Sequence, residues 1–456
     1  MQGGQTMTDL HQLSLHALSG LIGSRQISAL ELTDALIERC NAMASTSAMI
    51  TPTFEIARDA ARLRDAELAQ GISRGPMHGI PLGLKDAFAV QGVPTKLCGR
   101  TIPDTSADVW HALDAAGMAL LGKLHCAEFC LGAPGAQDMM PFARNPFDPA
   151  RSPGASSSGS AVALATGMVP AALGTDTGGS IRIPAAFCGV VGLKPTGGLL
   201  SAKGIFPLAP ALDQAGPMAR DSRDCAMLMD ALLSGSSPSE SFADALTERL
   251  DGVRIGYVAE FGADAGASPE QRTAVAQALN VLTDLGATVE EVALPPLQVF
   301  TDCFLPLMLS EAYALHAHAV IYDVDMSANT RVRLQGGAQI DADSVKRAKT
   351  QRAHLEQMVT PIWTRIDALV FEVVPGDPPL IETIHTLDYL KAPMLAVPAN
   401  LLNTPSLAVR CGTSQAGLPI GLQILGPRYE DRTVLRIGHA YEQASGHTGK
   451  PVEPVQ

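Results

Sequence analysis

Between residues 252 and 294 a strand, a capped helix and a second strand follow one another, and this order constrains the fold more than any other feature. The stretch "GVRIGYV" has the pattern of a strand, and "ATVEEVAL" provides a second one. In "SPEQRTAVAQALNVLTDLG" between them, Ser268 can cap a helix and Pro269 suits its first position. The stretch therefore predicts a β-α-β unit of an α/β protein.

Other parts of the chain fit this fold class. The short apolar runs "AGMALLGKL", "GVVGLKP" and "IDALVFEVV" are bounded by Gly and Pro, as buried strands of an α/β sheet are. An amphipathic helix is expected after Ser28, which forms a capping-box pattern with Glu31. The segment from about 295 to 395 is less regular and apolar enough to be buried or to cover a site. We expect the variable, substrate-facing part of the protein there.

Charge and composition restrict the partners. The chain has 456 residues and a formal net charge of −13, and its Lys and Arg residues are scattered. This distribution argues against nucleic acid or an anionic membrane surface, and so favours a small-molecule partner. The sequence contains no run of 18 apolar residues and no secretory signal pattern at its start. We expect a cytoplasmic protein whose residues 1–7 form a flexible tail.

The eight cysteines show no CxxC motif and no regular framework, so reduced thiols are expected rather than disulfides. In "KLHCAEFC", Cys126 and Cys130 lie near His125 and Glu128, which could be read as a set of metal ligands. No second Cys/His pair at finger-like spacing accompanies them. Small buried hydrophobic residues are the default interpretation, and no metal site is predicted.

Small residues dominate "RSPGASSSGSAVALATGMVPAALGTDTGGSIRIPAAFCGVVGLKP", residues 151–195. Ala and Gly at alternate positions after residue 160 suit a helix packed tightly on all sides, which places the serines at 156–160 at its N-terminus. In "TDTGGSIRIP" the glycines permit unusual backbone conformations, so consecutive N–H groups of 177–180 can converge on one anion. A serine hydroxyl beside such a nest is arranged for acyl transfer.

A nucleophilic serine needs a base, and the sequence leaves its identity open. None of the eleven histidines is placed in a recognisable triad. The G-x-S-x-G pattern fails because Ser158 occupies the position of the second glycine. Lys85 ends the apolar run in "HGIPLGLKDAFAV", and a lysine with apolar neighbours gives up its proton more easily. Most lysines are solvated surface residues, so spacing alone does not identify Lys85 as the base.

Several separate motifs in one order now point to a family. The chain carries, in sequence order, "GIPLGLKD", "NPFD", "GASSSGSAVALATG", "LGTDTGGSIRIPAAFCGVVGLKPT", "LDQAGPMAR" and "GLPIGLQILG". Together they resemble the amidase signature family, densely from 77 to 235 and again from 396 to 445. The resemblance implies a single α/β domain over residues 8–448, with a central mixed β-sheet covered on both faces by helices. It implies no metal and no cofactor, and a homodimer is possible.

The resemblance also assigns roles residue by residue. Ser180 matches the nucleophile, Lys85 the base, and Ser156 the bridging serine, which follows a cis peptide bond in the family. The expected oxyanion hole consists of the backbone N–H groups of Thr177, Gly178, Gly179 and Ser180. Ser157, Asp176 and Arg182 match supporting residues, and Cys130, Leu131 and Gly132 match positions near the acyl pocket. The chain departs from the family at Ala155 and Ser158, where glycine is usual.

Three functions are compatible with these residues. The first is a self-sufficient hydrolase that cleaves a C–N bond of a small amide, with an aryl amide or a carbamate (urethane) among the candidate substrates. The alternative is the amidase subunit of a glutamine-dependent tRNA amidotransferase, which needs partner subunits. "FCGVVGLKPT" is close to that subunit's motifs, whereas "PTGGLLSAKG" departs from its usual Tyr-Gly-Arg run. A non-catalytic scaffold is disfavoured because all three triad positions are intact.

Overall fold

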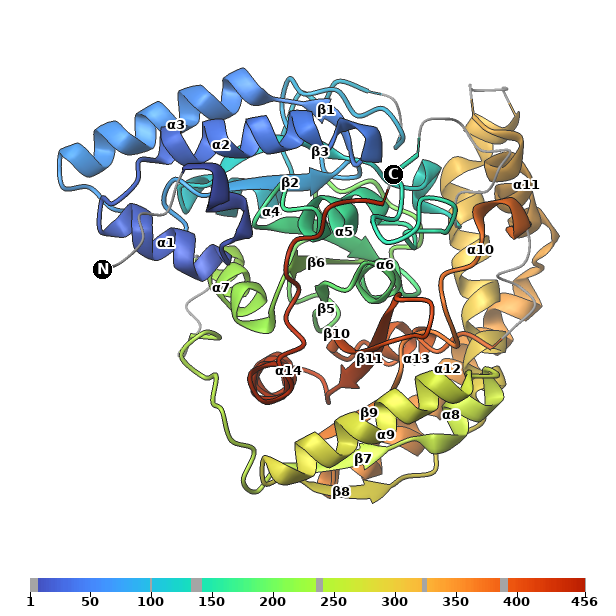
Figure 1. The fold of residues 1–456 in the computed structure, drawn as a ribbon. Helices are drawn as coiled ribbons and strands as arrows, with labels where there is room; N and C mark the ends of the chain where they lie inside the picture. Colours follow the sequence, from blue (N-terminus) through green and yellow to red (C-terminus); the bar gives the residue numbers. More distant parts are fainter. Residues whose placement is uncertain are drawn as a thin grey trace.

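One mixed β-sheet runs through the whole molecule. The computed structural model describes residues 7–98, 101–132, 142–234, 241–321, 326–385 and 393–455. Within them eleven strands pair in the order β1-β3-β2-β4-β6-β5-β10-β11-β9-β7-β8 (Figure 1). The strands are β1 (Met49–Pro52), β2 (Pro81–Lys85), β3 (Ala119–Leu124), β4 (Ala172–Asp176), β5 (Val191–Lys194), β6 (Gln214–Ala219), β7 (Arg254–Tyr257), β8 (Thr288–Glu291), β9 (Ala368–Glu372), β10 (Ser406–Thr413) and β11 (Pro419–Leu425).

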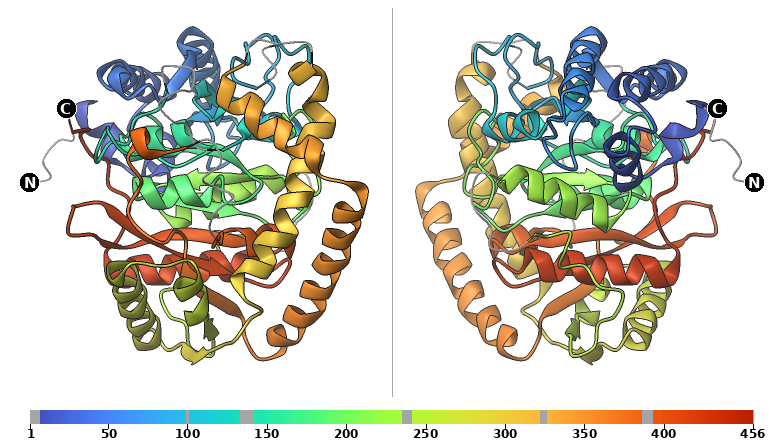
Figure 2. Two further views of the ribbon diagram at one scale, coloured as in Figure 1. Left: turned by 90° about the vertical axis from the view of Figure 1, so that its right-hand side faces the viewer. Right: turned by 90° about the vertical axis from the view of Figure 1, so that its left-hand side faces the viewer.

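Helices cover both faces of this sheet, as expected. The α-helices are α1 (Leu15–Gly23), α2 (Ala29–Ala42), α3 (Phe54–Ala69), α4 (Asp108–Ala115), α5 (Ser158–Ala165), α6 (Arg182–Cys188), α7 (Ser222–Leu233), α8 (Ala259–Asp264), α9 (Pro269–Asp284), α10 (Leu297–Ile321), α11 (Ala328–Gly336), α12 (Ala342–Val359), α13 (Val397–Leu401) and α14 (Asp431–Ser445). Figures 1 and 2 show α5 and α6 together on one side of the sheet, with α7 and α14 on the other. The protein is therefore a single α/β domain.

The predicted β-α-β unit is confirmed. It consists of β7, α9 and β8, and the two strands pair in parallel. The Ser268 side chain accepts a hydrogen bond from the Gln271 N–H, which satisfies one of the free donors at the start of α9. At the other end of the molecule, Ser28 and Glu31 form the expected capping box of α2. The predicted first turns of α2 and α9 are therefore confirmed.

The segment expected to be irregular is mostly helical. Helices α10, α11 and α12 form a layer at one side of the molecule, which is seen face-on in the left view of Figure 2. By length and composition, α10 is the one helix of the described ranges that could cross a membrane. It packs against α11, α12 and α13. Phe300, Phe304 and Leu307 of α10 are buried in these contacts, whereas Leu315 and Ile321 are exposed.

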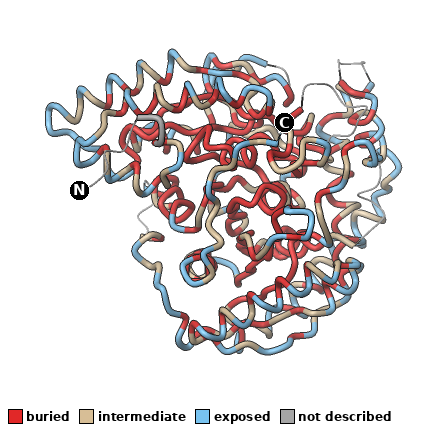
Figure 3. Tube along the Cα trace, viewed as in Figure 1, coloured by how far each residue is buried: buried red, intermediate tan, exposed pale blue. Residues whose placement is uncertain are grey.

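The interior is divided into two hydrophobic clusters. The larger follows the sheet from β1 to β11 and includes α5, whose eight residues are all buried. The smaller joins α10–α12 to β9 and to the turn at residues 129–131, and contains Phe304 and Phe371. Figure 3 shows buried backbone through the centre and exposed backbone along the outer helices. Of the predicted tail, residues 1–6 lie outside the described residues, whereas Met7 begins a 3₁₀ turn.

Candidate active site

The predicted base and the glycine-rich loop meet because two parallel strands end at the same edge of the sheet. Strands β2 and β4 are neighbours, with Gly83 opposite Ala172. Lys85 is the last residue of β2, and Asp176 is the last residue of β4. Because the carboxyl ends of parallel strands lie together, the sheet itself brings Lys85 to the loop that carries Ser180.

Lys85 contacts one of the two predicted serines directly. Its Nζ atom donates to Ser156 Oγ at 2.6 Å and to Thr175 Oγ1 at 2.6 Å. Lys85 is fully buried and Ser156 is 1% exposed. The peptide bond between Ala155 and Ser156 is cis, as the resemblance implies. The structure therefore places the predicted base and bridging serine in hydrogen-bond contact, away from bulk water.

Ser157 connects this pair to the predicted nucleophile. Its backbone N–H donates to the carbonyl oxygen of Ser180 at 3.1 Å. Its hydroxyl donates to the carbonyl oxygen of Thr175 at 3.2 Å. The segment that carries Ser156 is thus held between β4 and the Ser180 loop. Ser180 is only partly buried, unlike Ser156, so the predicted nucleophile is the member of the triad that a substrate can reach.

The glycine-rich loop differs from the predicted oxyanion hole at one residue. The Gly179 N–H donates to Asp176 Oδ1 at 2.8 Å, so this amide is engaged inside the loop. Gly179 has φ of +115°, a conformation that favours glycine, and a Cβ there would lie 2.6 Å from Ala396 Cβ. Gly179 therefore shapes the loop, and the expectation that its N–H faces the oxyanion needs correction. The reason is that the neighbouring carboxylate competes for the same donor.

Asp176 and Arg182 form a buried ion pair that fixes the loop. Arg182 donates from Nε and Nη2 to the two carboxylate oxygens at 3.0 Å each. Asn400 donates to Asp176 Oδ1 and accepts from Arg182, and Gln423 accepts from Arg182 Nη1. Burial opposes ionisation of Asp176, but the Arg182 guanidinium outweighs it and holds the pKa of the carboxyl below its usual range.

The predicted pocket residues lie beside a buried arginine of α11. Arg333 donates from Nη1 to the carbonyl oxygen of Leu131 at 3.4 Å. A Cβ atom on Gly132 would lie 2.7 Å from the Arg333 guanidinium carbon, so the absent side chain makes room for this cation. Segment 130–132 therefore lies against α11, at the edge of the variable helices.

Four residues at or near the site were not identified from the sequence. Thr175 accepts from Lys85, Asp213 accepts from Thr177 Oγ1 at 2.6 Å, Asn400 contacts the buried ion pair, and Arg333 lies against Gly132. Asp213 is part of the quoted "LDQAGPMAR" motif, which was a signal that could have been used. Arg333 belongs to the variable segment, where no local pattern distinguishes a pocket arginine from a surface one.

This arrangement can perform acyl transfer. It offers a partly buried serine hydroxyl on a glycine-rich loop, a second serine hydrogen-bonded to a buried amine, and a backbone contact that joins the segments carrying the two serines. The reduced thiols expected from the sequence are found, since all eight cysteines are buried and free of disulfides.

Comparison with known proteins identifies relatives that match over nearly the whole chain. A family model described as Amidase matches residues 31–435. A glutamyl-tRNA(Gln) amidotransferase subunit from Chloroflexus aurantiacus is 36% identical, over 98% of this chain and 99% of its own length. A crystal structure of an amidase superposes with a TM-score of 0.86 at 33% identity, covering 94% of this chain and 99% of the other. The corresponding amidotransferase subunit from Thermotoga maritima gives a TM-score of 0.80 at 27% identity, and the match covers 99% of each chain.

These relatives overturn one expectation. The net charge favoured a small-molecule partner over nucleic acid or a membrane, and the resemblance added an amide or carbamate substrate and a possible homodimer. The Chloroflexus relative, similar over nearly its whole length, is instead named as one subunit of an enzyme for glutamyl-tRNA(Gln). The charge argument was wrong because it treats one chain as the whole assembly. In a multisubunit enzyme, other subunits can carry the surface that binds nucleic acid.

Proposed function

This chain belongs to the amidase family, and from that premise we propose that it is the amide-cleaving subunit of a glutamine-dependent amidotransferase. It hydrolyses the side-chain amide of glutamine, and partner subunits use the ammonia to amidate glutamyl-tRNA(Gln). The observation that carries the proposal is the contact from Lys85 to Ser156 beside the Ser180 loop. A cytoplasmic location fits the tRNA substrate of the relatives.

The chemistry follows from this contact. Lys85 accepts a proton from Ser156, which takes one from Ser180, and the Ser180 oxygen attacks the amide carbon. Backbone N–H groups of Thr177, Gly178 and Ser180 stabilise the negative oxygen. The proton then returns along the same path to the leaving nitrogen, and ammonia departs. Water repeats the sequence to release glutamate from the acyl-enzyme.

Supporting residues keep these groups in place. Asp176 and Arg182 hold the conformation of the loop, and Ser157 holds the segment of Ser156 against Thr175 and Ser180. A preorganised loop needs no rearrangement when charge develops on the substrate oxygen.

Arg333 supports glutamine as the substrate. Glutamine differs from simple amides by its α-carboxylate and α-ammonium groups, and a planar guanidinium is well suited to bind a carboxylate. Arg333 lies against residues 131 and 132, the predicted acyl-pocket segment. We propose that it recognises the substrate carboxylate, so that glutamine binds with its side-chain amide directed towards Ser180.

A self-sufficient amidase is the second candidate. The amidase crystal structure is 33% identical to this chain, whereas the solved amidotransferase subunit from Thermotoga maritima is 27% identical. The departure at "PTGGLLSAKG" also favours it. The relatives named above include no urethanase, and carbamate cleavage is not part of the proposal.

The test is ammonia release by the purified chain from glutamine and from simple aliphatic and aryl amides. Each substrate is tested with the chain alone and with the chain together with the other amidotransferase subunits of the source organism. The variants are Ser180→Ala and, as a matched control, Ser201→Ala, whose hydroxyl contacts Asp108 at the surface. Glutamine hydrolysis that rises with the partner subunits and is lost only in Ser180→Ala supports the proposal. Turnover of simple amides without partners, and none of glutamine, selects the second candidate. Activity retained in Ser180→Ala refutes both.

A further inference from the structure

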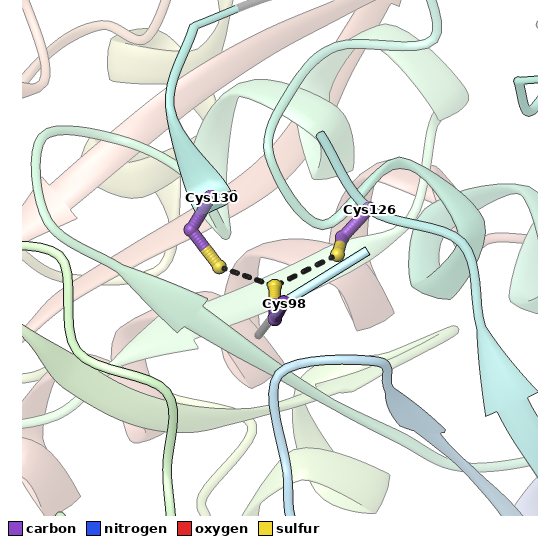
Figure 4. Close-up of side chains that lie close together, drawn as sticks. All are labelled: Cys98, Cys126 and Cys130. Carbon is purple, nitrogen blue, oxygen red and sulfur yellow. Dashed lines mark hydrogen bonds between the residues drawn. The ribbon is translucent and has the colours of Figure 1, made fainter. Parts of the chain in front are cut away.

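Three buried cysteines gather next to the candidate site, one of which, Cys98, is distant in sequence from the other two. Cys98 Sγ lies 3.6 Å from Cys126 Sγ and 3.5 Å from Cys130 Sγ, and all three sulfurs lie within 4.8 Å of one another (Figure 4). The three residues are at most 4% exposed. The sequence placed Cys126 and Cys130 near each other, but only the fold adds the third sulfur.

The local backbone directs the sulfurs to one point. Cys126 follows shortly after β3, and Cys130 ends the short 3₁₀ turn η3 (Glu128–Cys130). Phe129 and Cys130 have φ of +53° and +58°, a conformation uncommon for residues other than glycine. Two such residues in succession turn the chain back sharply. Backbone strain of this kind persists where the surroundings fix it and is common at functional sites.

The three clustered cysteines differ from other buried cysteines in what their sulfur atoms contact. Four other buried cysteines each direct the thiol to a backbone carbonyl oxygen, namely Cys40, Cys188, Cys225 and Cys303. In contrast, Cys98 has two sulfur atoms as neighbours at contact distance.

We propose that Cys98, Cys126 and Cys130 bind one Cu(I) ion through three sulfur atoms. A metal with bonds of about 2.3 Å to sulfur holds its ligand sulfurs about 3.8–4.0 Å apart. The two sulfur contacts of Cys98 need to lengthen by only a few tenths of an ångström, and the sulfurs of Cys126 and Cys130 already lie within 4.8 Å of each other. Thiolates are soft ligands that select Cu(I) or Zn(II), but structural Zn(II) sites almost always have four ligands. Among the described residues, no fourth Cys, His, Asp or Glu joins the group, which favours the three-coordinate ion.

Glu128 and His125 are near the cysteines in sequence, but each contacts a residue outside the cluster. Glu128 accepts from the Ser327 N–H at 2.9 Å, just before α11. The His125 Nδ1 atom lies 3.5 Å from Ser158 Oγ. Of the set suggested by "KLHCAEFC", only the two cysteines therefore belong to the cluster.

Two buried lysines lie beside the cluster, and Asp86 already compensates the charge of one of them, Lys123. Binding releases three thiol protons and leaves Cu(I) with three thiolates, a net charge of −2. Lys123 interacts electrostatically with Cys98 and Cys126, and Lys85 with Cys126 and Cys130. Lys123 also pairs with Asp86 at 3.4 Å, and both side chains are fully buried. Lys85 in its protonated form therefore offsets one of the two negative charges and favours the thiolates.

The test is an anaerobic titration of the reduced protein with Cu(I), using bicinchoninate as a coloured competitor, and a parallel titration with Zn(II). We expect one tightly bound Cu(I) per chain. Cys98→Ala and Cys130→Ala should weaken its binding by more than roughly a hundredfold, because even second-shell changes cost 10–100-fold. Cys225→Ala is the matched control and should bind as the wild type does.

X-ray absorption of the copper-loaded wild type tests the ligands without any substitution. Three sulfur neighbours at about 2.3 Å are expected. The proposal is overturned if no stoichiometric Cu(I) binds, if the Cys98 and Cys130 variants bind as the control does, or if nitrogen and oxygen dominate the copper environment. Tight binding of Zn(II) without Cu(I) would likewise overturn the three-coordinate assignment.

Discussion

Replacing Arg182 by Met tests whether the buried ion pair holds the catalytic loop. Met keeps most of the volume but removes the guanidinium that contacts Asp176, Asn400 and Gln423. Removing one partner of a buried ion pair costs about 3–5 kcal/mol, because the remaining charge is left without compensation. A chain of 456 residues has an unfolding entropy of about 1 kcal/mol/K, so the melting temperature should fall by about 3–5 °C.

The matched control is Arg62→Met. Arg62 pairs with Asp59 at 2.7 Å, but their side chains are 55% and 78% exposed. Such surface pairs contribute about 0–1 kcal/mol, so the control should melt within about 1 °C of the wild type. Thermal unfolding followed by circular dichroism measures both variants under identical conditions.

The pH dependence separates a charge effect from a packing effect. In the wild type the pKa of Asp176 is held below its usual range, so its contribution is complete at neutral pH and is lost as the pH falls through the lowered native value. In the variant, burial without the guanidinium favours the protonated carboxyl. The difference from the wild type should therefore be largest near pH 7 and shrink towards about pH 4. An equal difference at both pH values, or a loss no larger than that of the control, would refute the reasoning.

Three further predictions concern the site itself. Lys85→Met should lower the rate by about 10²–10⁴-fold at every pH from about 6 to 9, because it removes the group in contact with Ser156; a loss seen only at acid pH would indicate another base. Gly179→Ala should abolish turnover, because the new Cβ atom would meet Ala396. The control is Gly198→Ala, which should stay active because Gly198 also has a positive φ, +81°, but has open space around it. Equal activity of the two variants would contradict the role given to the loop. Arg333→Met should raise KM for glutamine by about tenfold or more and leave KM for propionamide unchanged. Steady-state kinetics on both substrates measure this difference. An equal change of the two KM values would disprove the carboxylate contact.

Local signals in the sequence were sufficient for the elements that carry their own caps and periodicity. Ser28 and Ser268 marked two helix starts, and the β7-α9-β8 unit followed from its strand and helix patterns. The hairpin of β10 and β11 was not predicted, although "GLPIGLQILG" was noted as a motif. Strands buried on both faces lack the alternation that identifies a half-exposed strand, so short apolar runs of this kind are ambiguous.

The site could be predicted only in part, because several of its contacts join residues that are distant in sequence. Lys85, Ser156 and Ser180 were recognised through motifs, and the contact of Lys85 with Thr175 depends on the pairing of β2 with β4. The contact of Asn400 with Asp176 joins residues 224 positions apart. Such contacts arise from tertiary packing, and nothing in the neighbouring residues of either partner indicates them.

The division of the interior into two hydrophobic clusters bears on how proteins of this design diversify. Helices α10–α12 pack mainly against one another, and their buried apolar residues belong to the smaller cluster. Mutations there can accumulate without loosening strands β2 and β4, which position Lys85. Phe304 is a point where the two parts touch, because its ring would lie 2.5 Å from a Cβ atom at Gly178. Selection for a new substrate can thus reshape one wall of the site through Phe304 and its neighbours while the chemical machinery is inherited unchanged.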